Sequence, residues 1–190
     1  MDRPLRRRLK PEARKREIVE AAERLLLARG SRVRVEDVVR EAGIAKGTFF
    51  LYFPSWDDLL ETVRDRLVAA FDSAYPLPTE VDGPVDWPAV VDAQAAGFVA
   101  FASARQGLGE ALFHSDFAER RPVGDHATLR LTAVIRAGQE AGAFGPVDPE
   151  PTARLLYAAI DEAARAVARG ADRAAMVTAL QTLLRRTLAP

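Results

Sequence analysis

The 190-residue chain contains no cysteine and only two histidines. Without cysteine it has neither disulfide bonds nor thiolate chemistry. No apolar run approaches the roughly 18 residues that a membrane-spanning helix needs, and the basic start lacks the apolar stretch of a secretory signal. We therefore expect a cytoplasmic protein with no membrane partner. With 48% hydrophobic and 28% charged residues, the composition is that of an ordinary globular protein.

The chain also lacks the signatures of common enzyme classes. It contains no phosphate-binding P-loop and no HExxH or GxSxG motif. His114, Asp116 and Glu119 lie close together in sequence, but one imidazole and two carboxylates occur by chance in most chains. We expect no catalytic residue, no metal site and no cofactor.

The formal net charge is zero, but the charges are unevenly distributed. Residues 1–53 hold 14 lysines and arginines against 8 acidic residues, and the remaining residues hold 13 against 19. This segregation favours a basic segment that faces a polyanion, followed by an acidic body. The alternative is a solvated tail, because a disordered segment at residues 3–16 would give the same imbalance.

Apolar residues recur at helical spacing through most of the chain, with no strand-like alternation. Proline, glycine and capping residues mark the ends of the expected helices. These helices span residues 11–29, 35–42, about two turns before Pro54, 56–73, 88–106, 108–118, 125–141, 149–169 and 171–188. The proline-rich stretch YPLPTEVDGPVDWP follows the first four. We expect an all-α protein of about nine helices, with a composition break near residue 75.

Two short helices flank the segment EAGIAKG, which has the outline of a helix-turn-helix. Gly43 can adopt the positive φ that a steep turn needs, and Ser55 with Asp58 form a capping-box pattern for the next helix. The second short helix needs its neighbours for stability, so we expect Phe49 and Phe53 in the core. Its other side would face DNA, where side chains reach base edges and phosphates. The expected DNA contacts there are Lys46, Gly47, Thr48, Phe50 and Tyr52; the alternative is that the aromatics are all core and bind nothing.

Residues 14–73 resemble the N-terminal domain of TetR-family transcriptional regulators, through REIVEAAERLLLARG, VEDVVREAGIAKGTFFLYF and PSWDDLL. The resemblance implies that the second short helix enters the major groove and that a homodimer binds double-stranded DNA at a palindromic operator. It also implies a repressor released by a small-molecule ligand. The domains would be a basic flexible arm at 1–13, a DNA-binding domain at 14–73 with its helix-turn-helix at about 34–53, and a ligand-binding and dimerisation domain at 74–190.

This chain departs from the family pattern at three positions. The family commonly has tyrosine at Phe50, lysine at Trp56, and serine or threonine at Arg34. The phosphate contacts that tyrosine and lysine would make are therefore in question at Phe50 and Trp56. Arg34 adds a further expected DNA contact. Trp56 stands three residues after Phe53 and four before Leu60, so we expect it to pack on them rather than lie on the DNA.

The last two helices, residues 149–188, are expected to form the homodimer interface as half of a four-helix bundle. The first is rich in alanine, which permits close helix approach. The second carries four apolar side chains at helical spacing: Met176, Leu180, Leu183 and Leu184. The alternative is that both helices pack inside one subunit.

The middle of the chain carries aromatic residues that predict an apolar pocket for an unknown ligand. The candidate ligand-binding residues are Trp87, Phe98, Phe101, Phe113, His114, Phe117 and Tyr157. The alternative is that the same residues are ordinary core. An alternative function for the whole chain is a helical protein–protein adaptor without sequence-specific DNA binding, although that function would leave the charge segregation unexplained.

Overall fold

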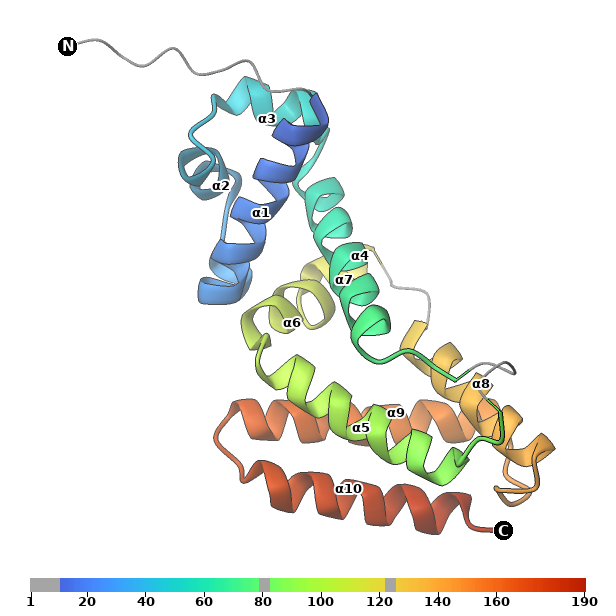
Figure 1. Ribbon diagram of the computed structural model, residues 1–190. Helices are drawn as coiled ribbons and strands as arrows, with labels where there is room; N and C mark the ends of the chain where they lie inside the picture. Colours follow the sequence, from blue (N-terminus) through green and yellow to red (C-terminus); the bar gives the residue numbers. More distant parts are fainter. Residues whose placement is uncertain (1–10, 79–82, 122–125) are drawn as a thin grey trace. The chain divides into compact units, whose positions relative to one another are not determined.

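The computed structural model describes residues 11–78, 83–121 and 126–190, and every regular element within them is helical (Figure 1). This confirms the expected all-α class. No helix in these ranges is long and apolar enough to cross a membrane. The elements are α1 (Pro11–Arg29), η1 (Gly30–Arg32), α2 (Val35–Glu41), α3 (Lys46–Tyr52), α4 (Trp56–Ala74), α5 (Trp87–Ser103), α6 (Gln106–Phe113), α7 (Asp116–Arg120), α8 (His126–Glu140), α9 (Pro149–Ala168) and α10 (Arg173–Leu188).

Most helix ends fall close to their expected positions, but the helix expected at 108–118 is two helices, α6 and α7. Ser115 divides them. Its hydroxyl donates to the carbonyl oxygen of Ala111 at 2.7 Å and accepts from the backbone N–H of Phe117 at 3.2 Å. One serine side chain thus bonds to the last turn of α6 and caps the start of α7.

The chain forms two compact units. The N-terminal unit joins the described residues up to Leu67 with Gly107–Arg121, and the second unit comprises Val68–Gln106 and the described residues after Pro122. Residues 1–10, most of the expected basic arm, lie outside the described residues, whereas residues 11–13 belong to the first turn of α1.

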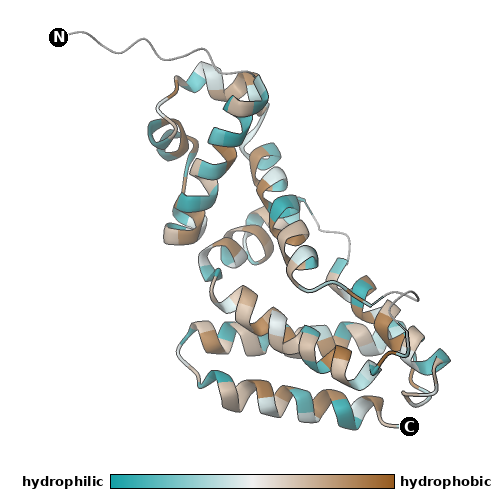
Figure 2. Cartoon of the chain, in the orientation of Figure 1, coloured by the Kyte–Doolittle hydropathy of each residue, from teal (hydrophilic) through white to brown (hydrophobic). Residues whose placement is uncertain are grey.

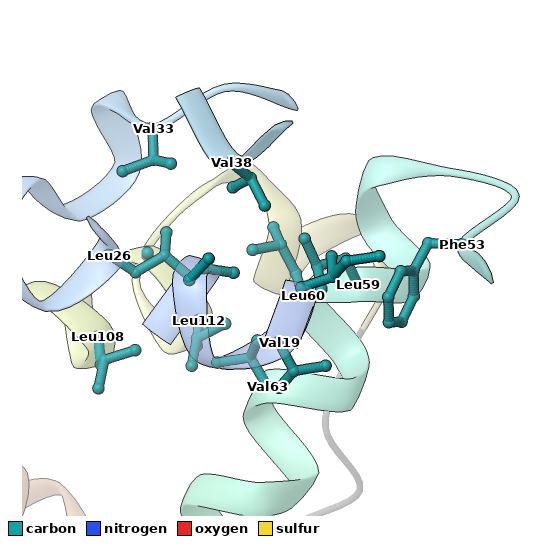
Figure 3. Packing of buried hydrophobic residues seen from close by; sticks show 14 of the residues in the cluster. Val19, Leu26, Val33, Val38, Phe53, Leu59, Leu60, Val63, Leu108 and Leu112 are labelled. Carbon is teal, nitrogen blue, oxygen red and sulfur yellow. The ribbon is translucent and has the colours of Figure 1, made fainter. Parts of the chain in front are cut away.

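The N-terminal unit is built on one apolar core to which α1 to α4, α6 and α7 all contribute. Figure 3 shows its side chains pointing toward one another, with Leu26 of α1, Leu59 and Leu60 of α4, and Leu108 and Leu112 of α6 among those labelled. Because helices as short as α2 and α3 are unstable alone, this shared core is what holds them.

Polar contacts also join α7 to α4 within the N-terminal unit. Arg64 is buried, and its Nη1 donates to the carbonyl oxygen of Arg121 at 2.7 Å. Its guanidinium lies 5.1 Å from the ring centroid of Phe117. Arg120 forms a two-pronged ion pair with Asp57, with both N–O distances at 2.9 Å. These contacts fix α7 against the start of α4.

The second unit packs α5, α8, α9 and α10 around its own apolar core. Helices α9 and α10 run side by side in opposite directions, joined by a short turn (Figure 1). Figure 2 shows both hydrophilic and hydrophobic residues along them, as amphipathic helices require. Asp92 of α5, largely buried, accepts from Nε of Arg185 at 2.8 Å and so ties α5 to α10.

The leucine row expected at the dimer interface divides between two faces of α10. Leu180 and Leu184 are only 5% and 0% exposed within a single chain. They belong to the second unit's own core, so the expectation that they face a second chain is wrong. Leu183 on α10 and Leu155 on α9 remain 46% and 73% exposed. The exposed leucines of these two helices are therefore Leu183, which belongs to the expected row, and Leu155, which does not.

Candidate nucleic-acid interface

The turn between α2 and α3 is set by Gly43, whose φ is +58° as expected from the sequence. Its N–H donates to the carbonyl of Arg40 at 3.1 Å, and the N–H of Ile44 donates to that of Val39 at 2.9 Å. These two bonds form a Schellman motif, in which the residue after the C-cap is left-handed. Ile44 and Val39 both pack on the apolar core of the unit, which supplies the hydrophobic contact that accompanies this motif.

Helix α3 is only seven residues long and is anchored by aromatic side chains on its inner side. Phe49 is fully buried, and Phe53 just after the helix is 2% exposed. Their ring centroids lie 5.8 Å apart. Both residues were expected in the core from the sequence, and the structure confirms this. The anchoring fixes which side of α3 faces outward.

The next helix begins with the capping box expected at Ser55 and Asp58. The Ser55 hydroxyl accepts from the Asp58 N–H at 3.1 Å, and the Asp58 carboxylate accepts from the Ser55 N–H at 2.9 Å. Trp56, the first residue of α4, is half-buried and packs against the apolar core. Phe53 and Leu60 belong to that core, so the expectation that Trp56 packs there agrees with the structure.

The outer face of α3 is formed by Lys46, Gly47, Phe50 and Leu51, all exposed. Phe50 is 43% exposed and Leu51 83%. A side chain added at Gly47 would meet no atom within 4 Å, so the backbone there is open to a ligand's close approach. Thr48 and Tyr52 flank this face and are half-buried, with Tyr52 packed on the core.

Two basic side chains of the expected interface already have partners within the chain. The Nζ atom of Lys46 lies 2.6 Å from Oε1 of Glu36 on α2. The hydrogen bond from Lys46 holds the pKa of Glu36 below its ordinary value. Arg34 is exposed, but its Nη1 donates to the carbonyl oxygens of Ser31 and Val33 at 2.8 and 3.1 Å. A phosphate would have to compete with these internal partners or share them.

The expected DNA contacts are therefore brought together around α3, with Arg34 at the start of α2. Sequence reasoning did not single out Leu51. The signal that would have found it is helical spacing, because Leu51 follows Gly47 by four residues, which is the distance between neighbours on one helix face.

The aromatic residues expected to line a ligand pocket divide between the two units. Phe113 and Phe117 pack in the core of the N-terminal unit, and His114 beside them is exposed. Trp87, Phe98 and Tyr157 pack in the second unit.

Within the second unit the rings of Phe98 and Phe101 both contact Phe71 edge-on, at centroid distances of 5.6 and 5.4 Å. Phe98 also contacts Tyr157 at 5.6 Å. Burial, with a smaller contribution from Asp161, raises the pKa of Tyr157 to about 12. Phe71 was missed from the sequence, although it lies near the end of the amphipathic helix α4.

Among the residues that the structure describes, no group of three or more histidine, aspartate or glutamate side chains has the arrangement of a metal site.

Comparison with known proteins places this geometry in a family. Residues 18–63 match the family described as "Bacterial regulatory proteins, tetR family", and residues 108–190 match the "Tetracyclin repressor-like, C-terminal domain". The HTH-type transcriptional regulator EthR of Mycobacterium tuberculosis is 39% identical over 84 residues, which cover 43% of this chain. The aligned stretch spans only 38% of that relative's length.

Solved structures share the fold over nearly the whole chain. A putative TetR-family regulator from Rhodococcus sp. gives a TM-score of 0.76 at 18% identity, covering 94% of this chain and all of that one. A putative regulator from Shewanella sp. PV-4 gives 0.73 at 23% identity, covering 93% and 98%. With the two family matches in order along the chain and the same fold throughout, the protein belongs to the TetR family of transcriptional regulators.

Proposed function

We propose that this chain is a DNA-binding transcriptional regulator whose helix α3 enters the major groove. The observation that carries the proposal is the two-sided character of α3: its inner residue Phe49 is fully buried, while its outer face is exposed. A seven-residue helix held this firmly presents a fixed set of side chains. In the major groove, such a helix reaches base edges with residues of one face and phosphates with residues at its flanks.

The residues of the face have separate roles in this proposal. Lys46 and Tyr52 contact phosphates, and Arg34 adds a further phosphate contact at the start of α2. Gly47 permits close approach, while Thr48 offers a hydroxyl and a methyl group to base edges. The basic segment at the beginning of the chain would add electrostatic attraction that falls with salt.

Selection of sequences from a random double-stranded DNA library by the purified full chain tests the proposal. We expect one enriched palindromic sequence. Thr48→Ala should then relax preference at one or two positions, by roughly 1–3 kcal/mol where a base is read. Lys46→Ala should weaken binding to all sequences alike. A chain that enriches no sequence would instead fit the adaptor function.

We further propose that the chain acts as a homodimer through α9 and α10. The support is the exposed face that these helices retain after packing in their own subunit, which includes Leu155, Ala158 and Leu183. Large leucine side chains beside small residues suit close packing of helices from a second chain. A twofold dimer binds two half-sites one helical turn, about 34 Å, apart, and therefore a palindrome.

The last part of the proposal is a repressor that a small apolar ligand releases from DNA. It is supported by the aromatic contacts of Phe71, Phe98 and Tyr157 in the second unit, where a phenol with a raised pKa would serve as a neutral hydrogen-bond donor. Thermal-shift screening of apolar compounds, followed by operator titrations with each hit, tests it. A compound that stabilises the protein yet leaves operator affinity unchanged would refute the coupling, because linkage between two ligands is reciprocal.

A further inference from the structure

Two adjacent large apolar side chains stand on the outer face of α3. Phe50 is 43% exposed and Leu51 83%. Leu51 is among the most exposed large hydrophobic side chains of the described chain. Gly47, one turn earlier, adds no side chain to this face and has open space around it. The middle of the face that would meet DNA is therefore apolar. Its positive charge, Lys46, lies at the first residue of the helix.

An apolar pair cannot recognise a base through hydrogen bonds, because neither side chain has a donor or acceptor. The major groove presents one apolar group among its base edges, the C5-methyl of thymine. Burying a methyl group against hydrocarbon is favourable, whereas an amino or carbonyl edge placed against the same surface loses its hydrogen bond to water. The pair thus favours thymine over the other bases at the positions that it covers.

We propose that Phe50 and Leu51 read thymine methyl groups, so that the operator carries thymine where these side chains meet the groove. This inference rests on the proposed DNA-binding function and adds to it the chemistry of base selection. Phe50 would contact a base through its ring alone, without the hydroxyl of the tyrosine that the family commonly has there. Leu51 would contact a thymine methyl group in the same way.

The position of Phe50 supports a fixed contact rather than a mobile one. Its ring meets the buried ring of Phe49 edge-to-face, with centroids 5.2 Å apart and planes at 86°. This arrangement is a preferred one for aromatic pairs. Since Phe49 is itself immobilised in the core, the edge of Phe50 is held in place before DNA arrives. Leu51, the next residue of the helix, is also exposed, and in this proposal the two side chains contact different base positions.

The test uses the operator selected by the full chain, with each thymine replaced in turn by deoxyuridine, which lacks only the methyl group. We expect binding about fourfold weaker at one or two positions of each half-site, the loss corresponding to one buried methyl-sized group. Replacing the same T·A pair by C·G and by 5-methyl-C·G should show the methylated pair binding about fourfold tighter than the unmethylated one. Thymines elsewhere in the operator should tolerate the replacement.

Variants assign the effect to these side chains. In Phe50→Ala and Leu51→Ala, the sensitivity to deoxyuridine should disappear at the position that each residue covers. Leu27→Ala is the matched control, because Leu27 is a leucine of α1 that is 47% exposed and lies off α3; it should keep the full sensitivity. Melting temperatures of all three variants establish that they are folded.

Three results would overturn the inference, and they differ from one another. If the operator is bound equally well with deoxyuridine at every position, methyl readout is refuted while DNA binding stands. If the sensitivity persists in both alanine variants, another residue such as Thr48 reads the methyl group. If the library yields no enriched sequence, the proposed function itself fails, and this inference fails with it.

Discussion

The Nζ atom of Lys46 on α3 lies 2.6 Å from the Oε1 atom of Glu36 on α2, and both side chains are more than half exposed. The hydrogen bond from Lys46 keeps the pKa of Glu36 low, so the carboxylate is ionised at neutral pH. In the proposed complex, an acid therefore lies beside the lysine that would contact a phosphate. In that complex Glu36 would oppose DNA binding, both by neutralising Lys46 and by repelling the phosphate backbone.

The first prediction is that Glu36→Gln tightens binding to all DNA sequences alike, by about two- to fivefold at low salt. Gel-shift or anisotropy titrations with operator and with unrelated DNA measure it. Glu41→Gln is the control, because Glu41 is another exposed acid of α2 but pairs with Arg24 of α1. Equal effects of the two substitutions would mean that only net charge matters and that Glu36 has no special position.

The second prediction concerns the dimer. Leu155→Arg places a charge on the proposed interface, so monomers should appear in light scattering or sedimentation experiments. Leu129→Arg is the control, because Leu129 is 65% exposed on α8 of the same unit and should leave the dimer intact. An unchanged dimer mass for Leu155→Arg would exclude this face of α9. The same substitution at Leu180 would be uninformative. Leu180 is buried within one subunit, so a charge placed there would unfold the chain whether or not it forms a dimer.

Local features of this fold were predictable from sequence because they depend on a few neighbouring residues. Gly43 with its positive φ and the Ser55 capping box both appear as expected. Phe49 and Phe53 were expected in the core because a two-turn helix needs an anchor. Their burial then determines the outer face of α3, and most expected DNA contacts lie around it.

Features that depend on distant partners were not predictable in the same way. Helical periodicity indicates that Leu108 and Leu112 of α6 are buried, but not which core buries them. They pack with α1 and α4 in the N-terminal unit. For the same reason the seven aromatic and histidine positions expected to form one pocket divide between the two units. Leu180 and Leu183 likewise read alike in sequence, and only packing separates the buried leucine from the exposed one.

The third prediction tests the packing of α6 within the N-terminal unit. A Cβ atom at Gly107 would lie within 2.5 Å of the carbonyl oxygen of Leu27 on α1, and closer still to that of Leu26. Gly107→Ala must therefore push α6 away from α1 and should destabilise the unit by roughly 1–3 kcal/mol. Chemical denaturation measures it.

Gly109 provides the matched control, since a Cβ atom there would meet nothing within 4 Å. Gly109→Ala should stabilise α6 by up to about 1 kcal/mol through helix propensity. If both substitutions stabilised the protein, α6 would not be held against α1 as described.

The fourth prediction is a pH dependence at the ion pair between Asp57 and Arg120. The hydrogen bonds from Arg120 hold the pKa of Asp57 below its ordinary value. The unfolded carboxyl therefore takes up a proton first as the pH falls, so the pair stabilises the folded state above about pH 4 and loses this contribution below it. The effect is small, because water screens a pair whose arginine is about half exposed.

A double-mutant cycle with Arg120→Gln and Asp57→Asn isolates this interaction. The coupling between the two substitutions, measured as a difference in melting temperature, should be present at pH 7 and fade toward pH 3. A coupling that stays constant over this range would show that charge is not its source.

The last prediction concerns Trp56, where the family resemblance leads us to expect lysine. Trp56 packs against the apolar core, so Trp56→Lys removes partly buried aromatic surface and should cost roughly 1–3 kcal/mol of stability. As the first residue of α4, it also stands at the positive end of the helix dipole, which disfavours a cation by about 0.3–1 kcal/mol. If the start of α4 lies beside a phosphate in the complex, the new charge should steepen the dependence of log K on log salt by about one unit.

Trp56→Gln separates the two effects, because it loses the same packing without adding charge. It should lower the melting temperature but leave the salt slope unchanged. A salt slope identical in all three proteins would mean that α4 begins away from the DNA backbone and that α3 enters the groove at a different angle.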